Sequence, residues 1–312
     1  MTTTKTVVAQ AYGGPEVLQL RDVEVPMPGP GEVLVDVRAA GTNPVDYKLY
    51  SGQMGADPDA LPLPVGLEVS GELAEVPPRA HGYTGPLKVG DAVIVTNISN
   101  GYSGKVIASV DDVGHKPATL TFEEAAGLLL TGGTAWHLLT KTNVGTGDTV
   151  LIHGAAGGVG LMAIQLAVAR GARVIGTASA GRHEALRRLG AEPVEYGAGL
   201  ADRVRALGTV DAALDLVGTD EALDTSVELV ADRGRIATIA GFARAGELGI
   251  AVLTGADDGQ AIRDAARPEL IKLAAAGQLK VSVDKVFPLA EAADAHRYLQ
   301  GGHARGKVVL VP

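Results

Sequence analysis

The stretch Thr149-Val-Leu-Ile-His153-Gly-Ala-Ala-Gly157-Gly-Val-Gly160 places four glycines within seven residues, directly after an apolar run. Val150 to His153 has the composition of a buried strand, and Val159 to Arg170 that of a helix. Glycines are needed between them where the backbone turns sharply and lets a diphosphate approach its N–H groups at the helix N-terminus. Arg173 to Thr177 follows as a second predicted strand, at the spacing of a mononucleotide-binding unit. We therefore expect a dinucleotide-binding turn, the alternative being a glycine-rich turn that serves only helix–sheet packing.

The same stretch has two unusual features. Ala155 occupies the first glycine slot, so the run departs from strict G-x-G-x-x-G. Thr149 to Ala169 contains no Asp, Glu, Lys or Arg and approaches the length of a membrane span. The crowded glycines in its middle favour a strand–turn–helix instead, and we expect no membrane segment.

The sequence on either side predicts the fold class. Before residue 115 short β-rich segments alternate with turns, whereas after the capping-box sequence Thr121-Phe-Glu-Glu124 strands and helices alternate. This rhythm predicts an α/β protein in which a parallel sheet covered by helices on both faces follows a β-rich part. The last ~40 residues leave that rhythm. The expected elements are strands at 33–38, 92–96, 173–177, 210–217, 235–240 and 307–311 and helices at 183–189, 221–230 and 291–299.

Composition excludes several classes of protein. The formal charge is −9, with 36 acidic and 27 basic residues and no dense basic run, which argues against nucleic acid as a partner. The chain has no cysteine, so disulfides and thiolate zinc sites are excluded. The start, Met1-Thr-Thr-Thr-Lys5, lacks the apolar core of a signal peptide. A cytoplasmic location is the resulting expectation.

The end of the second strand bears on the choice of coenzyme. NAD sites usually place Asp or Glu there to hold the ribose hydroxyls, and this chain has Ala178-Ser179 followed by Arg182 and His183. A hydroxyl and a guanidinium suit a 2′-phosphate, which Arg grips in fork geometry. We therefore expect NADPH. The alternative is that Arg182 and His183 only form the exposed first turn of a helix.

Several separated motifs together resemble the medium-chain dehydrogenase/reductase superfamily in its zinc-free quinone oxidoreductase branch. They are Tyr12-Gly-Gly-Pro-Glu-Val17, Pro28-Gly-Pro-Gly-Glu-Val33, Gly41-Thr-Asn-Pro-Val-Asp46, Gly66-Leu-Glu-Val-Ser-Gly71, Lys88-Val-Gly-Asp91, Thr131-Gly-Gly-Thr-Ala-Trp136, Ala155 to Gly160 and Gly306-Lys-Val-Val-Leu310. The resemblance implies a GroES-like β-rich catalytic domain, residues 1–120 completed by 266–312. A Rossmann NADP-binding domain with a doubly wound parallel sheet, residues 121–265, is then expected to be inserted in it. In zinc-dependent members a cysteine stands at the position of Asn43 and a histidine at that of Leu67, and Asn and Leu cannot hold zinc. No metal is expected.

The resemblance also implies site residues. Asn43, Asp46 and Thr134 are expected around the nicotinamide and substrate, with Tyr47 a candidate donor to a developing oxyanion. The alternatives are that Asn43 and Asp46 only cap a turn at Pro44, that Tyr47 only packs, and that Thr134 only starts a helix. The expected coenzyme contacts are Thr134, Ala155, Gly157, Gly158, Val159, Gly160, Ser179, Arg182, His183, Val217, Ile239 and Gly241. Gly249 to Thr254 resembles the edge strand through which members pair as homodimers.

The function predicted on this basis is metal-free hydride transfer from NADPH to a small-molecule quinone or α,β-unsaturated carbonyl. Such acceptors delocalise the incoming charge, so they need no strong Lewis acid. Two alternatives stay open, an enoyl reductase tailoring a polyketide-like intermediate and a non-catalytic NADPH-binding protein. The segment Asn100-Gly-Tyr-Ser-Gly-Lys105 departs from the family, in which an Ala-Glu pair more often follows the aromatic residue.

Overall fold

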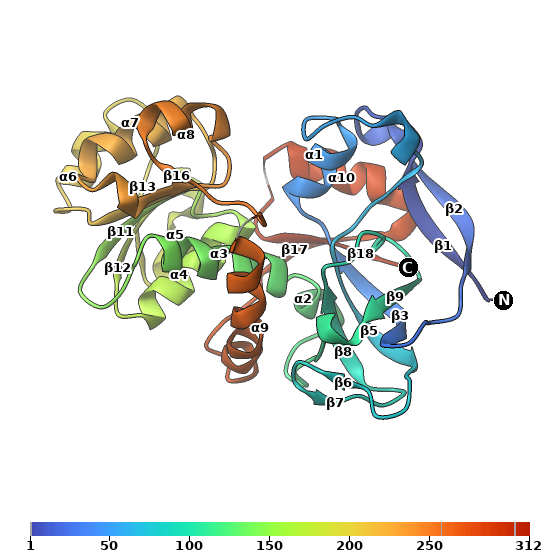
Figure 1. Ribbon diagram of the computed structural model, residues 1–312. Helices are drawn as coiled ribbons and strands as arrows, with labels where there is room; N and C mark the ends of the chain where they lie inside the picture. The colour runs from blue at the N-terminus through green and yellow to red at the C-terminus, as the bar shows by residue number, and fades with distance from the viewer. Residues whose placement is uncertain (1, 257, 303) are drawn as a thin grey trace. The chain divides into compact units, whose positions relative to one another are not determined.

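The computed structural model describes residues 2–256, 258–302 and 304–312, and these form two compact units (Figure 1). Unit 1 comprises residues 1–130, 271–277 and 281–312, and unit 2 comprises residues 131–270 and 278–280. No helix in the described ranges is long and apolar enough to cross a membrane. The predicted α/β fold with a Rossmann-like sheet is confirmed.

Unit 2 is built on a six-stranded sheet in the order β13-β12-β11-β14-β15-β16, in which every pairing is parallel. In Figure 1, α6, α7 and α8 lie on one side of this sheet and α4 and α5 on the other, as expected when crossover helices cover both faces. The strands are β11 (Thr149–His153), β12 (Arg173–Thr177), β13 (Ala191–Val194), β14 (Ala212–Asp215), β15 (Ile236–Thr238) and β16 (Ala251–Val252). The helices are α3 (Leu129–Lys141), α4 (Gly158–Ala169), α5 (His183–Arg188), α6 (Leu200–Arg205), α7 (Asp220–Leu229), α8 (Phe242–Leu248) and α9 (Gly259–Ala275).

Unit 1 is β-rich, and both ends of the chain contribute to it. Its main sheet runs β10-β8-β5-β3-β18-β17, with β9 also pairing β3, and its second sheet runs β2-β1-β4. The strands are β1 (Thr2–Ala9), β2 (Leu18–Val25), β3 (Glu32–Gly41), β4 (Leu63–Pro64), β5 (Glu68–Glu75), β8 (Ala92–Thr96), β9 (Lys105–Ser109), β10 (Val113–His115), β17 (Val283–Pro288) and β18 (Lys307–Val311), with a small hairpin β6 (His81–Gly82) and β7 (Gly85–Pro86). The helices are α1 (Pro44–Tyr50), α2 (Phe122–Ala125) and α10 (Ala292–Gln300). Because β18 pairs with β3, the last residues lie beside the first strands.

Most predicted elements coincide with the observed ones, and two differences have clear causes. The predicted strand 210–217 is shorter, because the Asp215 carboxylate accepts from the N–H groups of Val217 and Gly218 and turns the chain there. Thr134, for which a helix start was the alternative, lies inside α3 together with Gly132 and Gly133. A Cβ at these two glycines would lie 3.3 Å from Leu270 and 3.4 Å from Arg263, so glycine permits α3 and α9 to approach closely.

Candidate functional site

The glycine turn in unit 2 joins β11 to α4, as predicted. Helix α4 has Gly157 as its N-cap residue, with no side-chain hydrogen bond to the cap, and its first helical bond runs from Leu161 N to Gly157 O. The amides of Gly158, Val159 and Gly160 precede that bond and have no intrahelical acceptor. Three N–H groups and the positive end of the helix dipole suit an oxyanion, and a diphosphate fits these requirements.

Gly160 and Gly157 serve different purposes in the turn. A Cβ at Gly160 would lie 2.5 Å from Gly154 O and 2.6 Å from Ala155 O, so the turn itself requires glycine there. A Cβ at Gly157 would approach only Gly154 O, at 3.4 Å. Little protein packs against Gly157, and its small size leaves room for a ligand instead. This difference supports a nucleotide cradle rather than a turn used only for packing.

Two further loops lie beside this turn at the carboxyl ends of the parallel strands. Cβ positions built at Gly154 and Gly218 would lie 3.4 Å from Val217 and 2.9 Å from Gly241 N respectively. Asp215, fully buried, holds both loops: one carboxylate oxygen accepts from Val217 N, and the other accepts from Thr238 Oγ1 at 2.6 Å. Of the predicted coenzyme residues, the structure therefore brings the glycine turn, Val217 and Gly241 together.

The remaining predicted coenzyme residues of unit 2 have varied surroundings. Ser179 is exposed after β12, Arg182 and His183 are half-buried, and His183 Nε2 lies 3.1 Å from Ala178 O. No carboxylate follows the strand end, as the sequence indicated. Ile239, half-buried, donates its N–H to Asp215 O.

Thr134 is buried inside α3 and not at its start. The alternative of a helix-start residue is therefore wrong, because the helix begins at Leu129 and runs through Gly132 and Gly133.

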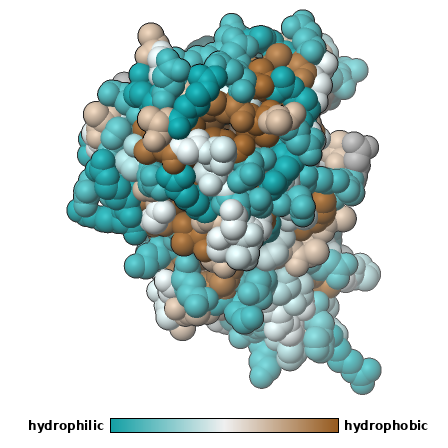
Figure 2. Space-filling model, turned by 90° about the vertical axis from the view of Figure 1, so that its left-hand side faces the viewer, coloured by the Kyte–Doolittle hydropathy of each residue, from teal (hydrophilic) through white to brown (hydrophobic). Residues whose placement is uncertain are grey.

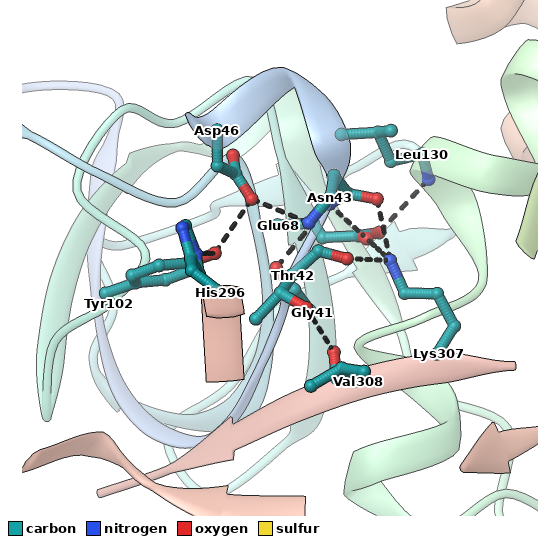
Figure 3. A network of polar contacts seen from close by, with 10 residues as sticks. All are labelled: Gly41, Thr42, Asn43, Asp46, Glu68, Tyr102, Leu130, His296, Lys307 and Val308. Atoms are coloured by element: carbon teal, nitrogen blue, oxygen red, sulfur yellow. Dashed lines mark hydrogen bonds and ion pairs between the residues drawn. The ribbon is translucent and has the colours of Figure 1, made fainter. Parts of the chain in front are cut away.

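Unit 1 contains a buried ion pair next to the predicted catalytic residues (Figure 3). Lys307, at the start of β18, places its ammonium 2.8 Å from Glu68 Oε1 and 2.7 Å from Asn43 Oδ1, and donates to Thr42 O. Asn43 Nδ2 in turn donates to Glu68 Oε1 at 3.0 Å, and Leu130 N donates to Glu68 Oε2. Both the oxygen and the nitrogen of the Asn43 carboxamide thus have hydrogen-bond partners within the protein, and the residue is 2% exposed.

Asp46, one turn into α1, is the second buried acid. Its Oδ2 accepts from Asn43 N at 2.7 Å and from Tyr102 OH at 2.8 Å, whereas Oδ1 has no partner among the described residues. Burial raises the pKa of Asp46 to about 7, and the hydrogen bonds from Tyr102 and Asn43 and the charge of Lys307 only partly oppose it. Through its hydrogen bond from Asn43 N, the carboxyl also caps the first turn of α1.

Tyr47 differs from Asn43 and Asp46. Its side chain is only half-buried, its ring meets that of His296 edge-on at 6.4 Å, and its hydroxyl has no hydrogen bond within the described ranges. Partial burial raises the pKa of Tyr47, so the hydroxyl is a neutral donor at physiological pH. It is the predicted catalytic residue of unit 1 that keeps a polar group available.

Four residues of this network were not among the predicted site residues: Glu68, Tyr102, His296 and Lys307. Glu68 and Lys307 lie within motifs that the sequence analysis quoted, and a lone charge at the start of the apolar run 307–311 was a signal that it did not use. Tyr102 lies in the segment noted as departing from the family. Nothing local distinguishes His296 from a surface histidine on an amphipathic helix.

The comparisons with known proteins agree with this geometry. Residues 29–153 match the family model described as the alcohol dehydrogenase GroES-like domain, and residues 189–310 match one described as a zinc-binding dehydrogenase. The quinone oxidoreductase of Pseudomonas aeruginosa is 35% identical over 99% of both chains. The chain belongs to the medium-chain dehydrogenase/reductase superfamily, in its quinone oxidoreductase branch.

Two other relatives show what this family includes. The chloroplastic NADPH-dependent alkenal/one oxidoreductase of Arabidopsis thaliana is 31% identical over 99% of this chain and 79% of its own. The structure of Escherichia coli quinone oxidoreductase complexed with NADPH superposes with a TM-score of 0.85 at 28% identity, covering 99% of this chain and all of the other. The chain is accordingly an oxidoreductase with relatives that act on quinones and alkenals.

Proposed function

We propose that this chain is a reductase that uses NADPH to transfer hydride, without a metal ion, to a quinone or an α,β-unsaturated carbonyl. The single observation that carries the proposal is the turn from Gly154 to Gly160. In this turn three N–H groups of the first turn of α4 have no intrahelical acceptor, and there is open space at Gly157. The next strand, β12, has no carboxylate at its end. When bound, the reduced nicotinamide supplies the hydride.

NADPH is proposed over NADH because of the residues after β12. Ser179 and Arg182 stand where an NAD site carries an acid, and Arg182 can grip a 2′-phosphate. NADPH also appears in the names of the alkenal/one oxidoreductase and the Escherichia coli complex that resemble this chain. In the proposed division of labour, residues 121–265 bind the coenzyme, and residues 1–120 with 266–312 bind the substrate.

Metal-free chemistry is proposed from the residues at the two positions where zinc-dependent members carry ligands. Asn43 Oδ1 accepts from the Lys307 ammonium, and Leu67 has no donor atom. No cluster of three or more His, Cys, Asp or Glu in the described ranges could hold a metal. Without a Lewis acid, the substrate must itself delocalise the charge that arrives with hydride, as quinones and enones do.

Tyr47 is the proposed hydrogen-bond donor to the substrate oxygen. Asn43 and Asp46 are engaged within unit 1, so we assign them the positioning of the first turn of α1, which presents Tyr47. A preorganised donor to a developing oxyanion contributes on the order of 10²-fold or more in kcat. Tyr47→Phe is therefore expected to lower kcat while leaving the Kd for NADPH unchanged.

A homodimer is the proposed assembly. Within the part of the chain that the structure describes, β16 pairs with β15 and has no strand on its other edge. Val252 on β16 and nearby Phe242 are exposed. The face in Figure 2 shows hydrophobic areas interrupted by hydrophilic surface. An open apolar edge invites pairing with a second copy.

Steady-state oxidation of NADPH in the presence of quinones, 2-alkenals and cyclic enones tests the proposal, with a chelator present throughout. We expect turnover with at least one acceptor class. Tight NADPH binding with no turnover of any acceptor favours the non-catalytic alternative. Turnover of only an acyl-thioester enone favours the tailoring reductase, and loss of activity with the chelator contradicts the metal-free mechanism.

Arg182→Ala tests coenzyme choice, with Arg188→Ala as the matched control. Arg188 ends α5, the short helix that follows Arg182, and pairs with Glu184 at 3.2 Å. Arg182→Ala is expected to weaken NADPH binding at least tenfold more than NADH binding, and Arg188→Ala to change neither. Equal losses for the two coenzymes would show that Arg182 does not recognise the 2′-phosphate.

A further inference from the structure

Four buried side chains in unit 1 form an unbroken chain of hydrogen bonds that begins at Asp46 in the first turn of α1. Tyr50 OH lies 2.7 Å from His296 Nδ1, His296 Nε2 lies 2.8 Å from Tyr102 OH, and Tyr102 OH lies 2.8 Å from Asp46 Oδ2. All four residues are fully buried, and Figure 3 shows Tyr102 between His296 and Asp46. The chain links α1 to α10 through the segment that precedes β9.

Proton counting fixes the direction of these bonds when Asp46 is ionised. Burial lowers the pKa of His296 to about 4, so its ring is neutral near pH 7 and carries one proton. Asp46 can then only accept, so Tyr102 donates to it. The oxygen of Tyr102 accepts from His296 Nε2–H, and Nδ1 accepts from Tyr50 OH.

Protonation of Asp46 leads to the opposite arrangement. A proton on Asp46 Oδ1 would be a buried donor with no partner in the described part of the chain, which is costly. A proton on Oδ2 faces the oxygen of Tyr102. Once Asp46 donates, Tyr102 must donate to His296 Nε2. The ring must therefore have released its proton from Nε2 and gained one on Nδ1, which it donates to Tyr50.

We propose that Asp46, Tyr102, His296 and Tyr50 form a proton-switching chain, in which one proton bound by Asp46 reverses three hydrogen bonds and exchanges the tautomers of His296. The protons move by relay: Tyr50 gives its proton to Nδ1, Nε2 gives its proton to Tyr102, and Tyr102 gives its own to Asp46. The Tyr50 oxygen takes up one proton from solvent, and the reverse relay returns it. His296 is neutral in both states, its Nε2–H bond replaced by an Nδ1–H bond.

The groups around Asp46 place the switch near neutral pH. Burial raises its pKa to about 7, the nearby charge of Glu68 acts in the same direction, and the charge of Lys307 acts against it. The titratable and charged groups that face Asp46 come from α1 itself, from β5, β18 and α10 and from the segment before β9, and are Tyr50, Glu68, Lys307, His296 and Tyr102.

The switch also contacts the proposed donor to substrate. The ring of Tyr47 packs edge-on against His296, and Asp46 Oδ2 holds the Asn43 amide at the start of α1. Asp46 and His296 are therefore positioning residues for Tyr47, a role in catalysis that rests on the proposed function. The switching itself does not.

Nitrogen-15 NMR of the imidazole ring of His296 in the full chain tests the switch without any substrate, and the His296→Gln spectrum supplies the assignment. From about pH 9 to about pH 5 the Nε2–H tautomer is expected to give way to Nδ1–H with a midpoint near 7. Their ratio should change about a hundredfold between one pH unit above the midpoint and one below it. A single tautomer throughout, or an imidazolium signature at the midpoint, would overturn the proposal.

Variants distinguish the proposed proton-switching chain from a general effect of pH on the protein. Asp46→Asn and Tyr102→Phe should each abolish the change of tautomer between about pH 6 and about pH 8. Tyr298→Phe is the matched control, because Tyr298 is also near His296 in sequence but donates to Asp284, and it should titrate as the wild type. Persistence of the tautomer change in folded Tyr102→Phe protein contradicts the chain. Should that variant fail to fold, Asp46→Asn decides by the same criterion.

A pH profile then tests the link to catalysis. The kcat for the best acceptor should change with a pKa near that of the tautomer switch in the wild type, and this change should be lost in Asp46→Asn. An NMR switch with an unchanged kcat profile removes only the positioning role. Absence of any turnover refutes the proposed function and leaves the NMR result standing.

Discussion

The buried pair of Lys307 and Glu68 gives the sharpest energetic prediction. Lys307→Met keeps the unbranched stem, which packs so closely on Gly127 that a Cβ there would lie 2.7 Å from Lys307 Cγ. It removes an ammonium that makes three contacts, with Glu68, Asn43 and Thr42. The side chains of Lys307 and Glu68 are 4% and 0% exposed, so water cannot replace the lost cation.

The expected cost follows from that burial. Removing one partner of a buried pair destabilises a protein by about 3–5 kcal/mol, because the other charge is left uncompensated. This is a large part of a typical folding free energy of about 5–15 kcal/mol. Replacing both charges, in Glu68→Gln with Lys307→Met, should cost much less than the sum of the single changes, since neither charge of the pair is left uncompensated. The coupling energy is expected to exceed about 2 kcal/mol.

Urea unfolding followed by near-ultraviolet circular dichroism and by fluorescence measures these free energies. The single tryptophan, Trp136, lies in unit 2, so its fluorescence reports that unit separately from the tyrosines of unit 1. The tyrosine signal should show the larger loss. A single-variant cost below about 1 kcal/mol, or additive costs in the double variant, would refute the view that Lys307 neutralises a buried carboxylate.

Three further predictions concern the turn, the second acid and the open edge. Gly160→Ala should destabilise unit 2, because its Cβ would meet backbone at 2.5 Å, whereas Gly157→Ala should leave the urea midpoint nearly unchanged and weaken NADPH binding in calorimetry; equal effects of both contradict the cradle. Because burial raises the pKa of Asp46 from 3.8 to about 7, its contribution to stability is present below about pH 4 and is lost as pH rises through 7. Relative to wild type, Asp46→Asn should therefore gain on the order of 3 kcal/mol between pH 4 and pH 8 in unfolding free energy, and a parallel pH dependence would count against the raised pKa. Val252 on β16 is 41% exposed, and Val252→Lys should convert a dimer to a monomer in sedimentation velocity. A dimer that persists would show that the interface does not involve β16.

Sequence periodicity and turn chemistry were sufficient to predict most of the fold. Val150 to His153 is apolar at every position but the last, and the glycines that follow admit only a tight turn, so β11 and α4 were predicted to within a residue. The Thr121 capping box is present, with reciprocal bonds to Glu124. The glycines inside α3 are permitted by close packing against α9, which local sequence does not show.

The buried network could not be predicted in the same way. Lys307 and Glu68 lie 239 residues apart, and each alone is an ordinary charged residue beside a strand. Only the pairing of β18 with β3 places that ammonium at Asn43. Asn43 was expected around the nicotinamide and substrate, and its carboxamide is held by Lys307 and Glu68, whereas Tyr47 keeps an available hydroxyl. Its role as a donor stays a prediction.

The measurement that tests the central claim most directly is titration calorimetry of the full chain with NADPH and with NADH, in wild type and in Gly157→Ala. The account predicts one NADPH site per chain, weaker binding of NADH, and a marked loss of NADPH affinity in a variant that folds normally. Absence of heat with either coenzyme, or an affinity indifferent to the substitution, would contradict it.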